Sequence, residues 1–296
     1  MGQKTKARIK FLLKLAVTAL ALWWVSRNIS WEEVFTELRE SQWGYLVGTL
    51  VLYNISQVIS GYRNLGLYRC LGVEMKPWMA VKLYYVGMFY NLFLPGGIGG
   101  DGYKVYWLQQ QYKSGVKKLS ASVLLDRMCG MLALGVLLLG LAGFLPLEVW
   151  PVPEAQWIGP TLLGIGVIGF FFIYLKWFPS FKPALGRSVF LSFGIQLSQV
   201  GAVIFILLAL GIFDQALSYL VVFLASSIAA VLPITVGGAG AREVLMVGAA
   251  EVMPIQESQA VTLSLLFFVQ AVASSLIGGL VQLPKKPAEE EEVTEE

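Results

Sequence analysis

The sequence has no histidine among its 296 residues and only two cysteines, Cys70 and Cys129. Without histidine, the chain lacks the usual general base and the commonest metal ligand. The cysteines lie in or near apolar segments with no pairing signature, so the sequence predicts neither a disulfide framework nor a zinc site. It also contains no nucleophile elbow, P-loop or metal-binding cluster. We therefore expect neither an enzyme nor a protein that needs a metal or another cofactor.

Charge is also scarce. Charged residues make up 14% of the chain, whereas soluble domains contain about 25%. Hydrophobic residues make up 56%, and the mean hydropathy is +0.68. This composition predicts an all-α, polytopic integral membrane protein. The net charge of +3 is small, and Lys and Arg form no tract apart from the ends of apolar segments, so nucleic-acid binding is not expected.

One broken apolar segment occurs twice. The first copy reads LPGGIGGDGYK (residues 94–104) and the second reads LPITVGGAGAR (residues 232–242), a spacing of 138 residues without a gap. Pro removes a backbone donor and Gly tolerates unusual conformations, so a helix is predicted to stop at each copy. Paired breaks at matching positions point to a transporter-type site, because irregular backbone survives in a bilayer only around protein or a water-filled cavity. The alternative is two loops between ordinary spans.

The distribution of Lys and Arg predicts the topology. Both termini are expected in the cytoplasm, with six full spans at about residues 9–26, 43–61, 119–141, 157–175, 188–210 and 259–283. The two broken runs, at residues 78–111 and 216–250, are expected to be re-entrant from opposite faces. Residues 1–283 then form one transmembrane domain with an inverted repeat (about 43–141 and 188–283), and residues 284–296 form a disordered acidic tail. If each broken run crosses fully, the chain has eight or more spans.

Each break is predicted to end where a short helix begins. Backbone N–H groups and the positive end of the helix dipole favour anions at such a point. Lys104 and Arg242 add a full positive charge, and Arg242 could bind a phosphate in bidentate fashion. The glycines that would let an anion reach the backbone are Gly99, Gly100, Gly237, Gly238 and Gly240. We predict two anion-binding half-sites, one for each face; alternatively, the glycines only build turns and the cations reach lipid headgroups.

Asp126 and Arg127 lie inside an apolar span. Each costs about 2.5–3.5 kcal/mol at mid-depth on insertion scales, so both should face the bundle interior and find partners. We expect Asp126 to pair with Lys104 or Arg127, and Arg127 to meet an anionic headgroup; a structural ion pair is the alternative. The equivalent positions in the second repeat are Ser264 and Leu265, so this charge is not symmetric.

Three further residues have two interpretations each. Asp101 suits a helix N-cap but could also take up a proton. Glu243 could neutralise Arg242 or relay a proton. Asn91 is a candidate substrate contact, although polar residues inside apolar runs more often form interhelical hydrogen bonds. Arg63 is expected to anchor the topology or a headgroup at a span end.

These motifs resemble the flippase-like integral membrane family found as the transmembrane part of lysylphosphatidylglycerol synthase. The matching stretches are Asn91 with residues 94–101, Asp126-Arg127 with Gly130, and residues 232–243, so the resemblance covers nearly the whole chain. It implies an inner-membrane protein that moves lipids between leaflets. Two departures stand out: no soluble aminoacyltransferase domain follows, so aminoacylation is not expected, and Lys104 stands where the family pattern has Arg.

The sequence therefore predicts a lipid transporter. An anionic or zwitterionic headgroup would bind near Lys104, Asp126 and Arg127 and pass toward Arg242, while the acyl chains stay in the bilayer. The expected partner is a membrane phospholipid or a polyprenyl-phosphate lipid. Two other classes stay open: a membrane subunit or enzyme of lipid-headgroup metabolism with a cytoplasmic transferase partner, and an ion or small-solute transporter.

Overall fold

The computed structural model describes residues 23, 27, 30–93, 99–146, 155–231 and 240–284. Within these residues all regular structure is helical, which confirms the all-α prediction. The helices are α2 (Trp31–Glu40), α3 (Trp43–Arg69), α4 (Pro77–Phe93), α5 (Gly99–Tyr112), α6 (Val116–Ala142), α7 (Ala155–Trp177), η2 (Pro179–Ala184), α8 (Leu185–Ala209), α9 (Ala216–Val231), α10 (Ala241–Ala250) and α11 (Glu257–Leu280). The predicted span at 9–26, the centres of both breaks (with Gly237 and Gly238) and the acidic tail lie outside the described residues.

Among the described residues, four segments are long and apolar enough to cross a membrane: Val116–Ala142, Trp157–Trp177, Pro179–Ala209 and Glu257–Leu280. They correspond to four of the six predicted spans. α3 corresponds to a fifth and has 27 residues, a length of about 40 Å. It does not reach the same hydropathy, because buried polar side chains line one side of it: Ser56, Gln57, Ser60, Arg63 and Asn64.

Helix α3 continues to Arg69, past the end of the second predicted span near residue 61. Its last two turns carry a mixture of polar and apolar side chains, which hydropathy does not recognise as part of a span. Leu65, Leu67 and Tyr68 are nonetheless buried against neighbouring helices. Tertiary packing therefore extends the helix beyond the end of the apolar run.

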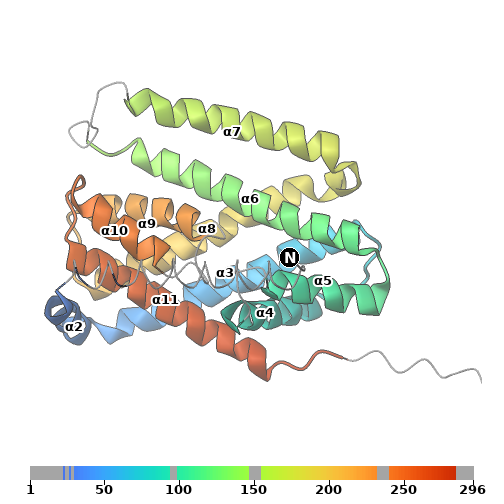
Figure 1. Cartoon of the computed structure of the whole chain (residues 1–296), viewed down its shortest axis with the longest axis horizontal. Coiled ribbons are helices and arrows are strands. Elements are labelled where there is room, and N and C mark those ends of the chain that lie inside the picture. Colours follow the sequence, from blue (N-terminus) through green and yellow to red (C-terminus); the bar gives the residue numbers. More distant parts are fainter. Residues whose placement is uncertain are drawn as a thin grey trace, which may run out of the picture.

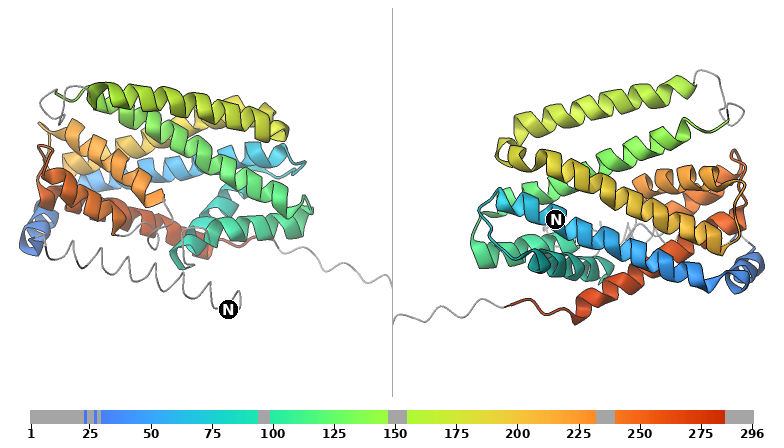
Figure 2. Two further views of the ribbon diagram at one scale, coloured as in Figure 1. Left: turned by 45° about the horizontal axis from the view of Figure 1, so that its top comes forward. Right: turned by 180° about the vertical axis from the view of Figure 1, so that it is seen from behind.

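The helices pack around a central pair, α3 and α8, which contact each other along their lengths. Helix α6 lies across α8 and α9, and α7 lies at the edge of the bundle against α6 (Figure 1). Two pairs of shorter helices, α4 with α5 and α9 with α10, lie at opposite ends of the long axis in both figures of the whole chain (Figures 1 and 2). Helix α11 contacts members of both pairs.

Two glycines allow unusually close helix contacts. A methyl group at Gly100 would overlap the backbone carbonyl of Gly87, so α4 and α5 approach each other backbone to backbone. A methyl group at Gly278 would likewise overlap the carbonyl of Tyr85, where α4 crosses α11. Only glycine leaves room at these points. Gly100, predicted as an access point for an anion, is therefore a packing residue.

Candidate functional site

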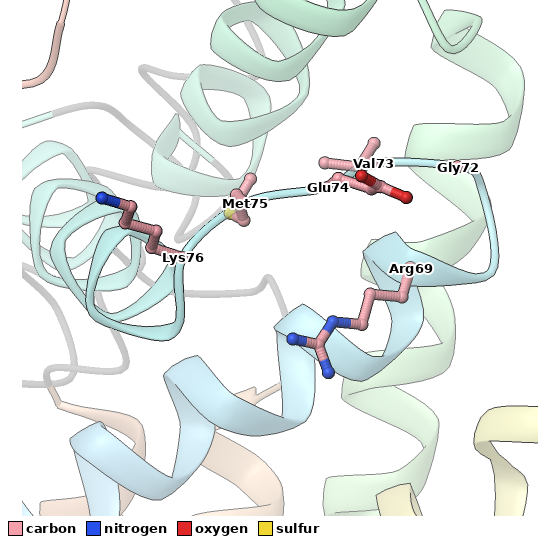
Figure 3. A pocket seen from close by; sticks show the side chains of 6 residues that line it. All are labelled: Arg69, Gly72, Val73, Glu74, Met75 and Lys76. Atoms are coloured by element: carbon pink, nitrogen blue, oxygen red, sulfur yellow. The ribbon is translucent and has the colours of Figure 1, made fainter.

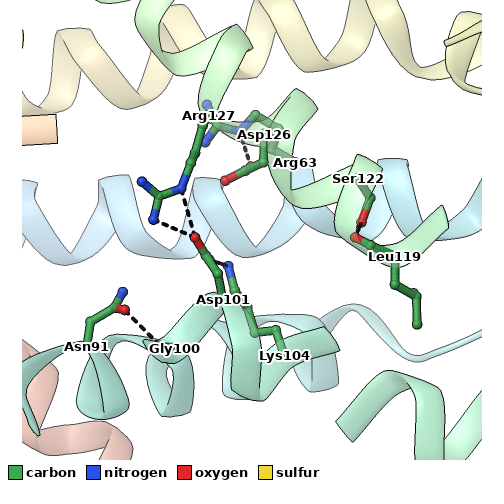
Figure 4. Close-up of polar contacts among 9 residues, drawn as sticks. All are labelled: Arg63, Asn91, Gly100, Asp101, Lys104, Leu119, Ser122, Asp126 and Arg127. Atoms are coloured by element: carbon green, nitrogen blue, oxygen red, sulfur yellow. Dashed lines mark hydrogen bonds and ion pairs between the residues drawn. The ribbon is translucent and has the colours of Figure 1, made fainter. Parts of the chain in front are cut away.

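Five charged residues from three helices form a cluster, which we call the paired cluster: Arg63, Asp101, Lys104, Asp126 and Arg127 (Figure 4). Arg63 Nε on α3 lies 2.7 Å from Asp126 Oδ1 on α6. Lys104 Nζ lies 2.7 Å from Asp101 Oδ1, both on α5. Arg127 on α6 donates to Asp101 Oδ2 from both Nη2 (2.6 Å) and Nε (2.8 Å). Asp101 thus links α5 to α6, and Asp126 links α6 to α3.

The local sequence explains this geometry. Asp101 and Lys104 are three residues apart on α5, so their side chains lie on the same side of the helix. Asp126 and Arg127 are adjacent on α6, and adjacent helical residues point about 100° apart. One therefore faces α3 and the other faces α5. The predicted partners of Asp126 are wrong: it pairs with Arg63, not with Lys104 or Arg127.

Two single-residue interpretations also change. Arg63, expected to anchor a span end, is only 6% exposed and also donates to Ser192 Oγ on α8 at 2.8 Å. Asp101 lies inside the first turn of α5 instead of at its N-cap. Ion pairing occupies both of its carboxylate oxygens. Both residues therefore lie in the interior of the protein, where a buried carboxylate and a buried cation each require a counter-ion.

The charges of the paired cluster do not cancel. It contains three cations and two carboxylates. Lys104, Asp101, Arg63 and Asp126 are nearly buried, and the Arg127 side chain is 34% exposed. Among the described residues, the cluster carries one excess positive charge while Asp101 and Asp126 are both ionised.

Polar groups that sequence reasoning missed lie beside this cluster. Asn64 and Tyr68 on α3 are each 1% exposed. Within the described part of the chain, the amide of Asn64 and the hydroxyl of Tyr68 have no hydrogen-bond partner. Tyr68 is close enough to Lys104 for electrostatic interaction, and Lys104 Nζ lies 5.1 Å from the centre of the Tyr84 ring. Buried polar atoms usually have partners, so these groups mark a place where water or a ligand would be stabilised. The repeated polar positions along α3 were the available signal.

The second half of the molecule holds its cation differently. The Arg242 guanidinium on α10 lies 4.9 Å from the ring centres of Phe223 on α9 and Phe267 on α11. We call these three residues the aromatic clamp. No carboxylate among the described residues lies within ion-pair distance of Arg242. Aromatic faces attract a guanidinium without neutralising it, so its N–H groups remain suited to an anion.

Among the described residues, Glu243 forms no ion pair with Arg242. Its Oε2 accepts from the backbone N–H of Gly240 at 2.8 Å, and its Oε1 accepts from the Ser264 hydroxyl at 2.7 Å. Gly240 has φ +84°, which suits glycine, and Glu243 caps the start of α10. Glu243 is therefore a capping residue.

One backbone amide at each helix start has an internal acceptor. Gly100 N–H donates to Asn91 Oδ1 at 2.8 Å, as Gly240 N–H donates to Glu243. Asn91 thus stabilises the contact between α4 and α5. These two amides are not available to an anion as predicted. The candidate anion sites are therefore defined by their cationic side chains.

Two hollows lie outside the clusters. One, of about 580 Å³, is formed by the loop between α3 and α4, with Arg69 and Lys76 at its two ends (Figure 3). The other, which we call the aromatic groove, has a volume of about 530 Å³ and lies between α4, α5 and the end of α11. Tyr90 and Tyr103 stack in it with ring centres 4.2 Å apart. Its lining residues include Tyr103 and Trp107, which share α5 with Asp101 and Lys104 of the paired cluster.

The described residues contain no group of three or more Cys, Asp or Glu placed to hold a metal ion. Comparison with protein families gives one match, to the lysylphosphatidylglycerol synthase TM region, over residues 11–185 and 176–279. The chain belongs to this family. Membership identifies it as a membrane protein of a family associated with lipids, in agreement with the apolar helices. No curated protein matches the chain.

Proposed function

We propose that this member of the lysylphosphatidylglycerol synthase TM family moves a lipid with an anionic or zwitterionic headgroup between the leaflets of the membrane. One observation carries the proposal: the polar side of α3 joins the two cationic sites. Tyr53 on α3 contacts Phe267 of the aromatic clamp, with ring centres 5.5 Å apart. Arg63, ten residues later, belongs to the paired cluster. Ten helical residues span about 15 Å, which is half the thickness of a hydrocarbon core.

The side chains between these points are suited to a headgroup. Ser56, Gln57 and Ser60 are buried on α3 between Tyr53 and Arg63. Gln199 on α8 donates to Ser56 Oγ at 3.5 Å, so α8 contributes to the same polar surface. Polar residues inside a membrane bundle commonly mark a substrate pathway. A headgroup held by Arg242 could thus exchange water for these side chains on its way to the paired cluster.

We further infer that α4–α5 and α9–α10 are re-entrant segments from opposite faces and form the core of an inverted repeat. The four helices have 17, 14, 16 and 10 residues. At 1.5 Å per residue they measure about 15–26 Å, less than the 30 Å of a hydrocarbon core. The members of each pair contact each other, and the pairs lie at opposite ends of the molecule (Figure 1).

The acyl chains need a place beside the protein while the headgroup crosses. The aromatic groove provides one, because its Tyr and Trp rings suit the boundary between acyl chains and headgroups. Helix α5 presents Tyr103 and Trp107 to this groove and Asp101 and Lys104 to the paired cluster. A lipid in the groove would therefore have its headgroup one helix away from the cations. In the cell membrane, with both termini in the cytoplasm, this end would serve the inner leaflet.

A liposome assay tests the proposal. Purified protein is reconstituted with fluorescent phosphatidylglycerol, and a membrane-impermeant reductant reports how fast the lipid changes leaflet. We expect faster exchange than in empty vesicles, and a 10- to 100-fold loss in Arg242→Ala, because hydrogen bonds to charged groups contribute about 1.5–3 kcal/mol. Arg39→Ala, on the exposed side of α2, is the matched control. Exchange no faster than in empty vesicles for phosphatidylglycerol, phosphatidylethanolamine and a polyprenyl phosphate would refute it.

The family name favours one alternative, a membrane subunit that serves a cytoplasmic transferase. On that account the chain itself catalyses nothing, and a transferase should copurify with it and lose activity when Asp126 is replaced by Asn. A small-solute transporter would instead give uptake of solute into vesicles without lipid exchange. The liposome assay separates both from the proposed lipid movement.

A further inference from the structure

Asp101 is the counter-ion of two cations, and a ligand that binds these cations must replace it. Its two carboxylate oxygens are bound by Lys104 of α5 and Arg127 of α6. Any anion that binds these two cations competes with Asp101 for the same donors. Asp101 is only 7% exposed, and an ionised carboxylate that loses its partners is very unfavourable in such a place.

The surrounding groups favour neutralisation of the displaced carboxyl group by a proton. Among the described residues, the charged and titratable side chains around Asp101 and its partner Lys104 come from four helices: Lys104 on α5, Asp126 and Arg127 on α6, Arg63 and Tyr68 on α3, and Tyr84 on α4. Arg63 already forms an ion pair with Asp126, so it does not serve as a new counter-ion for Asp101. Once Lys104 and Arg127 hold a ligand, no unpaired cation in this group is left for Asp101.

We propose that Asp101 takes up one proton from water when an anionic headgroup binds, and that the protein carries this proton across the membrane with the headgroup. The proposal rests on the proposed function and adds proton cotransport to it. The proton adds to a carboxylate oxygen of Asp101 as its ion pairs with Lys104 and Arg127 break. When the headgroup passes to the aromatic clamp, the ion pairs of Asp101 with Lys104 and Arg127 re-form. The proton follows the headgroup along the polar side of α3 and returns to water on the other side. For a singly charged headgroup the net charge moved is zero.

The second half supports a specific role for Asp101. The position equivalent to Asp101 is Ala239 in the sequence. The carboxylate that α10 does contain, Glu243, accepts from neutral donors and makes no ion pair with the described cations. The aromatic clamp can therefore accept an anion without a proton, and only the paired cluster requires one.

Binding measurements in detergent provide the first test. The affinity for phosphatidylglycerol is measured at pH 7 and pH 6, and proton uptake is measured with a pH indicator in weak buffer. Linkage of one proton to one lipid predicts up to about tenfold tighter binding at pH 6 and close to one proton taken up per lipid. Asp101→Asn should bind with no pH dependence, while Asp214→Asn, an exposed position, should behave as the unmodified protein. Equal affinity at both pH values without proton uptake overturns the proposal.

A gradient in liposomes provides the second test and needs no variant, so it decides even if Asp101→Asn fails to fold. With a difference of one pH unit, phosphatidylglycerol should accumulate in the leaflet that faces the alkaline side, approaching about a tenfold ratio. A potassium diffusion potential should have no effect, because the transported pair is neutral. Lipid exchange that ignores the pH gradient would remove proton cotransport and leave lipid movement intact. Absence of both binding and exchange would remove the proposed function itself.

Discussion

The two cationic sites occupy equivalent sequence positions and are built in opposite ways. Lys104 is neutralised by a carboxylate three residues earlier, and the same carboxylate also binds Arg127. Arg242 is followed at once by Glu243, which points elsewhere and caps its helix. Two phenylalanine rings support Arg242 instead. One site must therefore break ion pairs to bind an anion, whereas the other is prepared for it.

The difference shows how two copies of one sequence motif can form sites with different structures. The spacing of carboxylate and cation decides whether they meet: three residues place them on one side of a helix, and one residue does not. An alternating mechanism can use this inequality, because the aromatic clamp binds a headgroup without a proton and the paired cluster binds it with one. Three variants would break or sharpen this comparison.

The largest effect is expected from Asp126→Ala. It leaves Arg63, only 6% exposed, without its counter-ion, and breaking a buried pair costs about 3–5 kcal/mol. Thermal unfolding in detergent measures the loss. The double variant Arg63→Met/Asp126→Leu should recover most of the stability, because apolar residues can replace a buried ion pair. A loss below about 1 kcal/mol in the single variant would mean that Arg63 is supported mainly by Ser192.

An intermediate effect is expected from Phe267→Leu. It removes one ring from the aromatic clamp and also the ring contact with Tyr53. A cation–π contact contributes about 0.5–2 kcal/mol, so binding of phosphatidylglycerol should weaken by about 2- to 30-fold. Phe268→Leu, one residue away and 42% exposed, is the matched control. Equal affinity in the two variants would show that the ring does not hold the guanidinium.

The smallest effect is expected from Ser264→Ala, at the position equivalent to Asp126. It removes one hydrogen bond to Glu243 and should destabilise the protein by about 1 kcal/mol. Binding of lipid should stay within twofold, because Glu243 keeps its bond to Gly240 and does not touch Arg242. Thermal unfolding and lipid titration measure the two parts. A large loss of binding would place Glu243 in the anion site after all.

The sequence predicted the positions of the helices better than the side-chain contacts between them. The broken runs and the inward position of Asp126 and Arg127 follow from apolar length, Pro-Gly breaks and the cost of buried charge. The pairing of Asp126 with Arg63 could not be derived, because the two residues are 63 positions apart and no local spacing relates them. The predicted use of Gly100 N–H failed for the same reason: its acceptor, Asn91, lies on the other helix of the α4–α5 pair.

The polar side of α3 also has a consequence for how the protein is made. Arg63 meets Asp126 only after 63 further residues have been synthesised, and Ser192 only after 129. Until then the most polar of the long helices leaves the ribosome without its partners and is poorly suited to enter lipid alone. Insertion of α3 must therefore wait for, or be assisted until, the arrival of α6 and α8, so that a helix near the start of the chain is among the last to reach its final place.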